Sequence, residues 1–319
     1  MRAVTLDKKG EVIVSENVKP EPGAREVRIR VVMSSLNFAD LKQIRSGSKA
    51  VLGLDCVGIV EKVGDKVSKV KTGDRVMAFP FTSGHAEFAI ATEALVFPIS
   101  AEIGWEQAAA APIVTFLSYF LTQKIHKLLP EDTMIVHAAS GGVGTTIIQL
   151  AKNLGVQTII GTVGNLSKAA AVYNAGATHV FTYNAFKEET LHVTNNVGVS
   201  VVFDSVAGQV TQDSLDVLAR FGTLIQFDNA SGQRSVFTNV DVHKSCRTIK
   251  GFSFGTTRKY RPNVVEEIAA DVLNLLEKRE LVLATDKTFL LADAQEAYAY
   301  VKSRHHTGKV LLKISELGK

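Results

Sequence analysis

The first hundred residues alternate polar and apolar positions in short runs. In EVRIRVV (26–32) charged and apolar side chains follow one another, as in a strand with one buried face. Similar runs occur at 57–64, 73–79 and 85–91, and Gly, Asp and Lys residues separate them. Short strands with frequent turns predict an antiparallel barrel or sandwich in this part of the chain.

The pattern changes near residue 105. Apolar runs of buried-strand length now alternate with segments of helical period. The predicted strands cover 133–139, 157–163, 179–183, 199–206 and 223–227, and the predicted helices cover 145–155, 167–177 and 211–222. This alternation predicts a parallel sheet with right-handed crossovers. A long amphipathic helix over 263–281 and a strand in GKVLLKI (308–314) are expected to follow. The fold class is therefore α/β, with two domains in 319 residues.

Composition narrows the classes of function. Lys and Arg total 36 against 32 acidic residues, a net charge of +4 without any basic run, so nucleic-acid binding has little support. The charged N-terminus lacks the apolar core of a signal peptide, and the apolar stretch 108–121 is too short for a bilayer. With only two cysteines, Cys56 and Cys246, we expect a cytoplasmic protein without disulfides and without a membrane segment.

A glycine cluster connects the first predicted strand of the α/β region to the next helix. The strand ends at Ala138–Ala139, and Gly141, Gly142 and Gly144 follow before the helix. Such a loop lets the backbone approach a pyrophosphate at a helix N-terminus, which is typical of dinucleotide binding. No Lys-Ser/Thr pair follows, which excludes a P-loop. The alternative is a turn that only packs the helix closely on the strand.

The region after the second strand bears on the choice of nucleotide. NAD sites place a carboxylate about 20 residues after the loop, on the ribose 2′-hydroxyl. Here 161–171 contains no acid and instead offers Asn165, Ser167 and Lys168. Hydrogen-bond donors and a positive charge suit a 2′-phosphate, so NADPH is favoured over NADH. The alternative for Lys168 is a solvated residue at a helix start.

Several motifs together resemble a known family. They are AASGGVG, FDSVAG, ARFGTLIQFDNASG and TGKVLLKI, preceded by SSLNFADLKQIRSG and LGLDCVGIVEKVG. In this order they resemble the zinc-independent, zeta-crystallin-like quinone oxidoreductases of the medium-chain dehydrogenase/reductase superfamily. The resemblance covers nearly the whole chain. It implies a GroES-like catalytic domain (1–112), a Rossmann NADP-binding domain (113–255) and a C-terminal segment (256–319) that returns to the catalytic domain.

The resemblance also implies cofactor contacts, sorted here by the part of NADPH that they would touch. Pyrophosphate contacts would come from Gly141, Gly142, Val143 and Gly144. The adenosine 2′-phosphate and ribose would be surrounded by Asn165, Ser167, Lys168 and Tyr183. The nicotinamide ribose would lie near Phe227, Asn229 and Ser231, and Ser118 takes a place near the nicotinamide usually held by Thr. For Tyr183 and Phe227 the alternative is an ordinary core aromatic.

The implied reaction is hydride transfer to a quinone or to an alkene conjugated to a carbonyl. Negative charge then grows on the carbonyl oxygen and requires a donor. Asn37 is the expected donor, because LNFAD matches the family's Asn-x-x-Asp loop. Asp40 is expected to fix that loop through backbone hydrogen bonds rather than to transfer a proton. Arg45 is either a donor at the pocket edge or a surface ion-pair partner.

Two departures from the family leave the substrate and the proton donor open. Only SKAV (48–51) stands where relatives carry a longer segment with an aromatic and several prolines, and the 37–47 loop has no Tyr. The pocket is therefore expected to be wider and more polar. No metal is expected, because Leu54 replaces the histidine of zinc-dependent relatives and the pair His305–His306 is more typical of a surface feature.

Three further interpretations remain from the sequence. An enoyl or alkenal reductase would use the same hydride chemistry on a C=C bond. A non-enzymatic nucleotide- or RNA-binding protein would use the same fold without catalysis. The resemblance also implies a homodimer formed through the edge strand of the Rossmann sheet within 229–254, and the alternating apolar positions in 234–242 suit that edge strand.

Overall fold

The computed structural model describes residues 1–47 and 49–316, which form two compact units. Unit 1 comprises Met1–Phe116 and Gly255–Lys319, and unit 2 comprises Leu117–Phe254. The resemblance implies domain boundaries after residues 112 and 255, and the two units divide after residues 116 and 254. Ser48, the first residue of the short 48–51 segment, lies outside the described residues.

Unit 1 is built around an antiparallel sheet with the strand order β14-β15-β3-β4-β5-β7, and β6 pairs with β3. Only β14 and β15 are parallel to each other within it. A separate hairpin, β1–β2, is joined to the unit by a bridge between Ala3 and Ala86. The strands are β1 (Arg2–Leu6), β2 (Val12–Glu16), β3 (Glu26–Leu36), β4 (Cys56–Val63), β5 (Arg75–Ala78), β6 (Phe88–Thr92), β7 (Val96–Pro98), β14 (Thr285–Leu290) and β15 (Lys309–Lys313).

The sequence pattern predicts one long helix in the C-terminal part of unit 1, where the structure has two shorter ones. The segment 263–281 forms two helices rather than one, because Ile268, with φ −98° and ψ −6°, interrupts the helical backbone. The apolar period continues across this break, so the pattern does not mark it. The α-helices are α1 (Phe38–Arg45), α2 (Trp105–Ala110), α3 (Pro112–Tyr119), which continues into unit 2, α9 (Phe254–Tyr260), α10 (Pro262–Glu267), α11 (Ala269–Glu277) and α12 (Ala294–Ser303).

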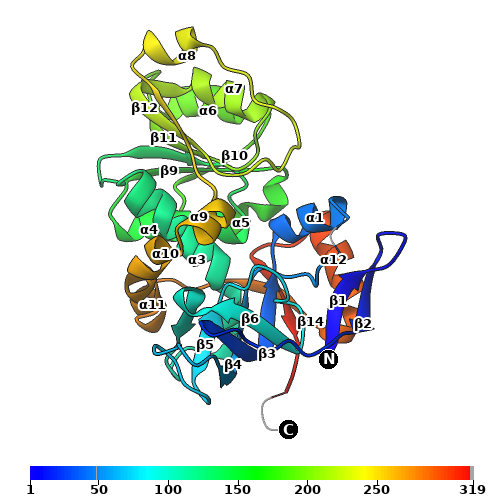
Figure 1. Ribbon diagram of the computed structural model, residues 1–319. Helices are drawn as coiled ribbons and strands as arrows, with labels where there is room; N and C mark the ends of the chain where they lie inside the picture. The colour runs from blue at the N-terminus through cyan, green and yellow to red at the C-terminus, as the bar shows by residue number, and fades with distance from the viewer. Residues whose placement is uncertain (48, 317–319) are drawn as a thin grey trace. The chain divides into compact units, whose positions relative to one another are not determined.

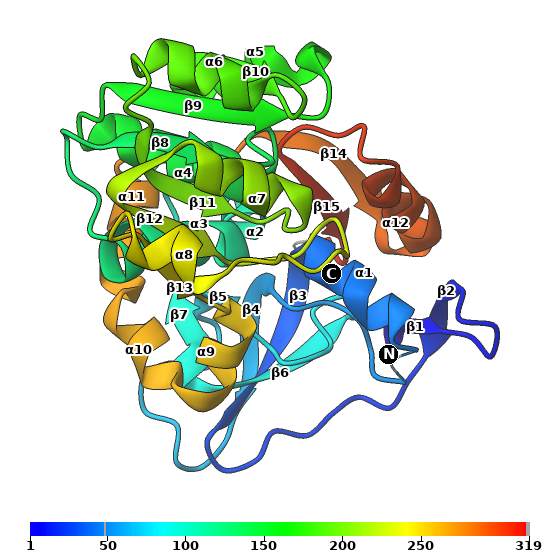
Figure 2. The same ribbon diagram turned by 90° about the horizontal axis from the view of Figure 1, so that it is seen from above.

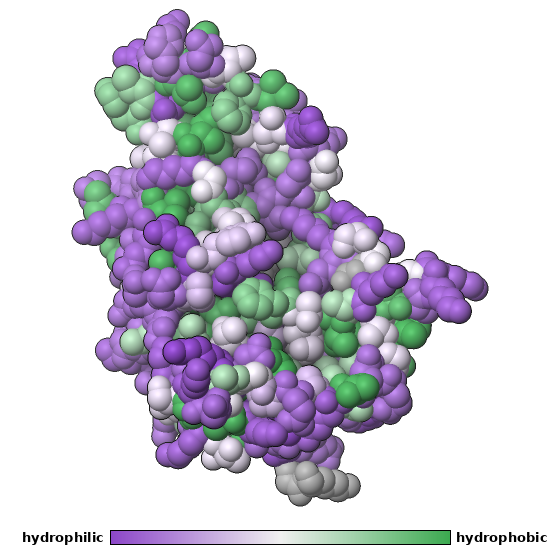
Figure 3. Space-filling view, viewed as in Figure 1, coloured by the Kyte–Doolittle hydropathy of each residue, from purple (hydrophilic) through white to green (hydrophobic). Residues whose placement is uncertain are grey.

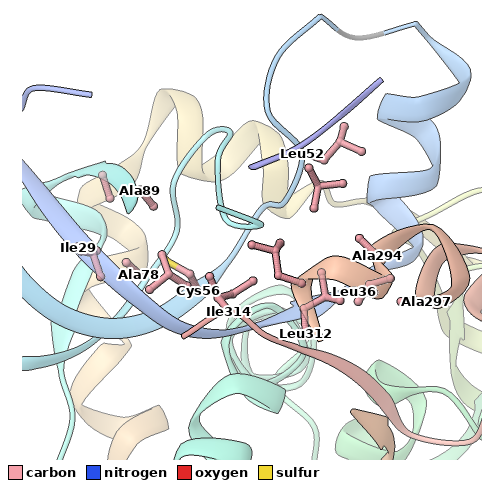
Figure 4. Packing of buried hydrophobic residues seen from close by; sticks show 14 of the residues in the cluster. Ile29, Leu36, Leu52, Cys56, Ala78, Ala89, Ala294, Ala297, Leu312 and Ile314 are labelled. Carbon is pink, nitrogen blue, oxygen red and sulfur yellow. The ribbon is translucent and has the colours of Figure 1, made fainter. Parts of the chain in front are cut away.

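The apolar core of unit 1 joins the two ends of the chain. Leu36 at the end of β3 and Leu312 of β15 are buried, and Figure 4 shows both beside Ala294 and Ala297 of α12. The antiparallel pairing of β15 with β3, in which Val310 lies opposite Leu36, brings these residues together. Burying apolar side chains of this size is worth about 1.5–3 kcal/mol each. The C-terminal strand is therefore part of the core that also contains the N-terminal strands.

Unit 2 confirms the predicted parallel sheet. Its strand order is β10-β9-β8-β11-β12-β13, and every neighbouring pair is parallel. Helices α4 and α5 cover one face, and α6 and α7 cover the other (Figure 1). Figure 2 shows the strands following one another from β10 to β13. The elements are β8 (Thr133–Val136), α4 (Gly142–Asn153), β9 (Thr158–Val163), α5 (Ala169–Ala175), β10 (His179–Thr182), α6 (Phe186–Val193), β11 (Val199–Asp204), α7 (Gln209–Asp216), β12 (Leu218–Gln226), α8 (Asn239–His243) and β13 (Thr248–Gly251).

The helix predicted over 211–222 is too long. Helix α7 ends at Asp216, and β12 already begins at Leu218. The pairing of β12 with β11 shifts between Val199 opposite Leu218 and Val201 opposite Thr223, so β12 carries extra residues in a bulge there. Phe221, with φ +64°, lies in this bulge. The bulge breaks the period-2 alternation that would have predicted a strand.

The edge strand expected within 229–254 is β13, but the alternating apolar positions of 234–242 do not belong to it. Residues 227–238 are irregular and lead into the short helix α8. Asp241 accepts a hydrogen bond from the Thr238 backbone N–H (2.6 Å), which is the reciprocal arrangement that starts a helix. None of the described helices is long and apolar enough to cross a membrane.

Candidate functional site

The glycine loop of unit 2 is a tight turn held by backbone hydrogen bonds. Ala138 has φ +51°, and its N–H donates to the Tyr183 hydroxyl at 2.9 Å. The Gly141 N–H donates to the Ala138 carbonyl at 3.0 Å, and α4 begins at the next residue. The first N–H groups of a helix have no partner within the helix, and they attract anions. Tyr183 directly follows β10, which lies two strands from β8, and its hydroxyl thus fixes the entry to this turn.

Two glycines of the loop have different structural needs. A Cβ on Gly144 would lie 2.6 Å from the Ala138 oxygen and 2.7 Å from the Ala139 Cα, so close helix–strand packing requires this glycine. A Cβ on Gly141 would meet nothing nearer than the Ala138 oxygen at 3.4 Å, which is an ordinary contact. Packing therefore accounts for Gly144 and leaves Gly141 unexplained.

Ser118 ties α3 to this loop. Its buried hydroxyl donates to the Val143 carbonyl at 3.2 Å, in the first turn of α4. The chain after α3 continues as a π-helical segment, Phe120–Ile125. Segments of this kind are rare and are frequent at functional sites. Ser118 thus lies against the same helix start as the glycine loop.

The residues after β9 form an exposed turn without a carboxylate. The Asn165 side-chain oxygen accepts the Ser167 N–H at 2.8 Å and caps a 3₁₀ turn, Leu166–Lys168. Ser167 is exposed and Lys168 is half-buried. Because β9 neighbours β8 in the sheet, this turn and the glycine loop follow adjacent strand ends. The strand order reverses between β8 and β11, and ligands of open α/β sheets bind at that point.

The segment after β12 is held against the end of β11. The Ala230 and Ser231 N–H groups donate to the carbonyls of Ser205 and Val206, each at 2.9 Å. The exposed Asn229 accepts the Gly232 N–H at 2.8 Å and the Ser231 hydroxyl at 3.3 Å. These side-chain bonds close the segment into a turn.

Phe227 and Asp204 support the same segment. Half-buried Phe227 donates its N–H to the Asp204 carbonyl at 2.9 Å. The buried Asp204 carboxylate accepts the Val206 and Ala207 N–H groups at 2.7 and 3.0 Å. Asp204 was not identified from the sequence as a site-forming residue, although an acid at the end of a buried strand was a usable signal.

Unit 1 contains a buried polar cluster around the Asn37–Asp40 turn. The Asp55 carboxylate accepts the Ser35 N–H (3.2 Å), the Ser35 hydroxyl (2.9 Å) and the Asn37 side-chain amide (3.0 Å). The Asn37 Nδ2 also lies 3.2 Å from the Ser35 carbonyl, and its Oδ1 accepts from the Lys309 ammonium at 2.7 Å. Both amide hydrogens of Asn37 therefore point to acceptors within unit 1.

Asp40 is fully buried in the first turn of α1. Its Oδ2 accepts the Asn37 backbone N–H at 2.7 Å, and its Oδ1 has no partner among the described residues. Burial raises the pKa of this carboxyl to about 7, against the opposing effect of the Asn37 hydrogen bond. The Asp55 charge raises that pKa further, while Lys309 and Arg258 lower it.

A histidine and a tyrosine complete the cluster. The His85 Nε2 donates to the Ser35 carbonyl at 3.1 Å, so Nδ1 carries no hydrogen and accepts from the Tyr298 hydroxyl at 2.8 Å. Burial lowers the pKa of His85 to about 4, which keeps the ring neutral. Gly53 makes room for His85, because a Cβ at position 53 would lie 2.4 Å from the His85 backbone nitrogen and 2.5 Å from its ring Cδ2. Neither His85 nor Tyr298 was recognised from the sequence.

The remaining sequence-based candidates lie elsewhere in unit 1. Arg45 is exposed on α1. Leu54 accepts a hydrogen bond on its carbonyl from the buried Arg258 (2.8 Å). His305 and His306 lie in the connection between α12 and β15. Within 1–47 and 49–316, no three His, Cys, Asp or Glu side chains gather closely enough to hold a metal ion.

Comparison with known families matches both units. Residues 23–122 match the alcohol dehydrogenase GroES-like domain, and residues 142–270 match the family described as zinc-binding dehydrogenase. A quinone oxidoreductase from Pseudomonas aeruginosa is 32% identical over 313 residues, which cover 95% of each chain.

Solved structures are similar over almost the entire chain. The Escherichia coli quinone oxidoreductase complexed with NADPH superposes with a TM-score of 0.91 at 28% identity, covering 98% of this chain and 100% of that one. A 2-haloacrylate reductase superposes with a TM-score of 0.88 at 25% identity, covering 99% and 100%. The combination of GroES-like and Rossmann-type folds is thus shared with enzymes of reductive chemistry.

We expect Gly144→Ala and Gly141→Ala to differ sharply in their effects on stability. The Gly144 variant forces a methyl group into backbone atoms and should lower the free energy of unfolding by about 1–3 kcal/mol. The Gly141 variant should stay within about 0.5 kcal/mol of the wild type. Urea unfolding followed by circular dichroism measures both. Equal losses would contradict the assigned packing.

We expect Asp40→Asn to stabilise the protein increasingly as the pH rises. The folded pKa is raised from the ordinary 3.8 to about 7, so the folded protein binds a proton that the unfolded chain has lost across this interval. The cost of burying the carboxylate grows through that interval and is constant above it, at about 1.4 kcal/mol per pKa unit. The Tm difference between variant and wild type should therefore be larger at pH 8 than near pH 4.5. An unchanged difference would contradict the raised pKa.

Proposed function

Because this chain belongs to the quinone oxidoreductase family of the medium-chain dehydrogenases/reductases, we propose that it transfers a hydride from NADPH to a quinone. The family membership confirms the resemblance seen in the sequence. The observation that carries the choice of nucleotide is the turn after β9, where Asn165, Ser167 and Lys168 stand and a carboxylate is absent. The related E. coli enzyme was solved in complex with NADPH.

The proposed nucleotide contacts all come from unit 2. Gly141, Gly142, Val143 and Gly144 would offer the backbone at the start of α4 to the pyrophosphate. Lys168 would supply the positive charge for the 2′-phosphate, together with Ser167. Asn165 is proposed to shape this turn, because its side-chain oxygen is engaged by the Ser167 N–H. Tyr183 would lie beside the nucleotide, because its hydroxyl accepts the Ala138 N–H at the entry to the glycine loop.

The nicotinamide side of the nucleotide is assigned to the segment after β12 and to Ser118. Phe227, Asn229 and Ser231 lie in a turn whose backbone is tied to β11 at several points. A rigid turn of this kind suits a group that must be held in one orientation for hydride transfer. Ser118 would hold the first turn of α4 through Val143.

The acceptor side is assigned to the Asn37–Asp40 turn of unit 1. NADPH supplies the hydride, and negative charge then develops on the acceptor oxygen. Since both amide hydrogens of Asn37 face acceptors of the protein, we propose that Asn37 shapes the turn rather than donates to the substrate. Asp40 holds the same turn through the Asn37 N–H. The proton that completes the reduction would then come from solvent.

A second candidate acceptor is an alkene conjugated to a carbonyl group. The similarity to a 2-haloacrylate reductase, at a TM-score of 0.88, favours this class. Hydride addition to such an alkene and to a quinone places the same charge on an oxygen. The two activities therefore differ in the shape of the acceptor and not in the residues assigned here.

We also propose that the reaction does not use zinc. Leu54 cannot ligate a metal through its side chain, and its carbonyl is occupied by Arg258. The thiolate is the metal-binding form of cysteine. Burial raises the pKa of the Cys56 thiol well above its ordinary value, so this side chain stays protonated.

A cytoplasmic homodimer is proposed as the working form. Both cysteines are free, Cys56 buried and Cys246 exposed. The edge strand β13 is preceded by exposed apolar side chains at Val236, Phe237 and Val240. Figure 3 shows hydrophobic side chains among hydrophilic ones in the region of α8. A second copy that covers this edge would pair the open edge of β13 and would bury these apolar side chains.

We expect Lys168→Ala to lose mainly the preference for NADPH. Removal of a charge-assisted hydrogen bond costs about 1.5–3 kcal/mol, which corresponds to roughly a tenfold to hundredfold weaker NADPH affinity. The affinity for NADH should remain nearly constant. Titration followed by nicotinamide fluorescence measures both, and Lys127→Ala, at an exposed lysine elsewhere in unit 2, is the control. Equal losses for the two nucleotides would contradict the assigned role.

We expect purified protein with NADPH to reduce a simple quinone, such as 1,4-benzoquinone. The rate is followed as loss of absorbance at 340 nm, with an α,β-unsaturated ketone as the second acceptor. Faster turnover of the ketone would favour the reductase alternative. Tight NADPH binding without turnover of either acceptor would overturn the enzymatic proposal and leave a nucleotide-binding function.

A further inference from the structure

Lys309 is a buried cation at the start of the last strand. The pairing of β15 with β3 sets Val310 opposite Leu36, and Lys309 therefore lies beside the Asn37 turn. Its side chain is 4% exposed. The ammonium donates to the Leu36 carbonyl at 3.0 Å and to the Asn37 Oδ1 at 2.7 Å. Residues 272 positions apart in the chain are thus joined by one side chain.

A buried ammonium needs compensation, because its transfer from water costs several kcal/mol. Burial lowers the pKa of Lys309, and the charges of Asp55 and Asp40 oppose that shift. An apolar residue of similar volume is often neutral or stabilising at such a position. The hydrogen bonds that the ammonium donates to Leu36 and Asn37 are therefore what distinguishes Lys309 from an apolar residue here.

The three groups Lys309, Asn37 and Asp55 dictate one orientation of the Asn37 amide. An ammonium can only donate, so the amide atom that faces Lys309 must be the oxygen. A carboxylate can only accept, so the atom that faces Asp55 must be the nitrogen. Rotation of the amide by half a turn would place its nitrogen, a donor, against the Lys309 ammonium and its oxygen, an acceptor, against the Asp55 carboxylate. The charged groups at both ends therefore select one orientation of this side chain.

The orientation of the side chain is passed on to the backbone turn. Asn37 precedes α1, and its N–H is held by Asp40 while its side chain is held by Lys309 and Asp55. Lys309 also holds the Leu36 carbonyl, the last backbone group of β3. The turn is consequently fixed on both sides of Asn37.

We infer that Lys309 is a positioning residue that holds the Asn37–Asp40 turn in the geometry used for the acceptor. This inference rests on the proposed function, which assigns the turn to the acceptor side. Lys309 would act through Asn37 and would not itself touch the substrate. The residue therefore belongs to the reaction, although it lies in the last strand of the chain.

The test is Lys309→Met, which keeps the length of the side chain and removes its charge and donors. We expect kcat/KM for the quinone to fall by roughly tenfold to hundredfold, as for the loss of one charge-assisted hydrogen bond. The proposed nucleotide contacts lie in unit 2, so the NADPH dissociation constant should change by less than about twofold. A fall in NADPH affinity as large as that in kcat/KM would overturn the inference.

Arg28→Met is the matched control. Arg28 is another buried cation of unit 1, on β3, and it pairs with Glu21 and Glu61. Its loss should lower Tm without lowering kcat/KM for the folded protein. If Arg28→Met and Lys309→Met reduce kcat/KM equally, Lys309 is only structural.

A double-mutant cycle tests whether the effect passes through Asn37. In the presence of Asn37→Ala, Lys309→Met should cause little further loss of kcat/KM. Full additivity would overturn the relay. If Lys309→Met does not fold, Lys309→Gln serves instead, since its amide can donate but no longer dictates the orientation of Asn37. Wild-type kcat/KM in Lys309→Gln would also overturn the inference.

A readout without turnover separates this inference from the proposed function. The side-chain amide of Asn37, identified by its absence in Asn37→Ala, should exchange slowly with solvent in the wild type and faster in Lys309→Met. If the wild type reduces no acceptor but this difference appears, the proposed function fails and the positioning by Lys309 stands. If the wild type is active and Lys309→Met is equally active, only the inference fails.

Discussion

The antiparallel pairing of β15 with β3 is the contact on which unit 1 depends. It sets Leu312 against the apolar core and, one residue before the paired stretch, brings Lys309 to Asn37. Side chains on a strand alternate between faces, so a shift of one residue would turn Leu312 away from this core and move Lys309 away from Asn37. The same register therefore determines the core and the polar cluster. Neither can be changed without the other.

The two candidate sites are held by different means. In unit 2 the glycine loop is held by backbone hydrogen bonds and by the close packing of Gly144 against Ala138 and Ala139. In unit 1 the turn is held by side chains, and two carboxylates and two cations are buried close to one another. A backbone loop tolerates changes in solvent, whereas a buried ionic cluster responds to pH. The Asn37–Asp40 turn of unit 1 is therefore the more pH-sensitive of the two candidate sites.

The fold could be predicted largely from the sequence, because β8 to β13 and the helices between them carry strong local periods. The errors have two causes. The bulge near Phe221 depends on distant pairing with β11, whereas α8 begins at a local capping box of Thr238 and Asp241 that lies within an alternating apolar pattern. In the site, glycines and the absence of a carboxylate were visible in the sequence. Lys309, His85 and Tyr298 were not, because only the fold brings them to Asp55 and Ser35.

The division of unit 1 into two chain segments has a consequence for synthesis on the ribosome. Unit 2 is one continuous segment and can form its sheet as soon as its last strand emerges. Unit 1 begins first but lacks β15 until nearly the whole chain has been made, so the Met33–Leu36 end of β3 has no partner on that side for most of translation. Unit 2 can therefore complete its fold before unit 1, although unit 1 contains the first residues of the chain. Premature termination before residue 309 would release a chain with a complete nucleotide fold and an open, aggregation-prone N-terminal sheet.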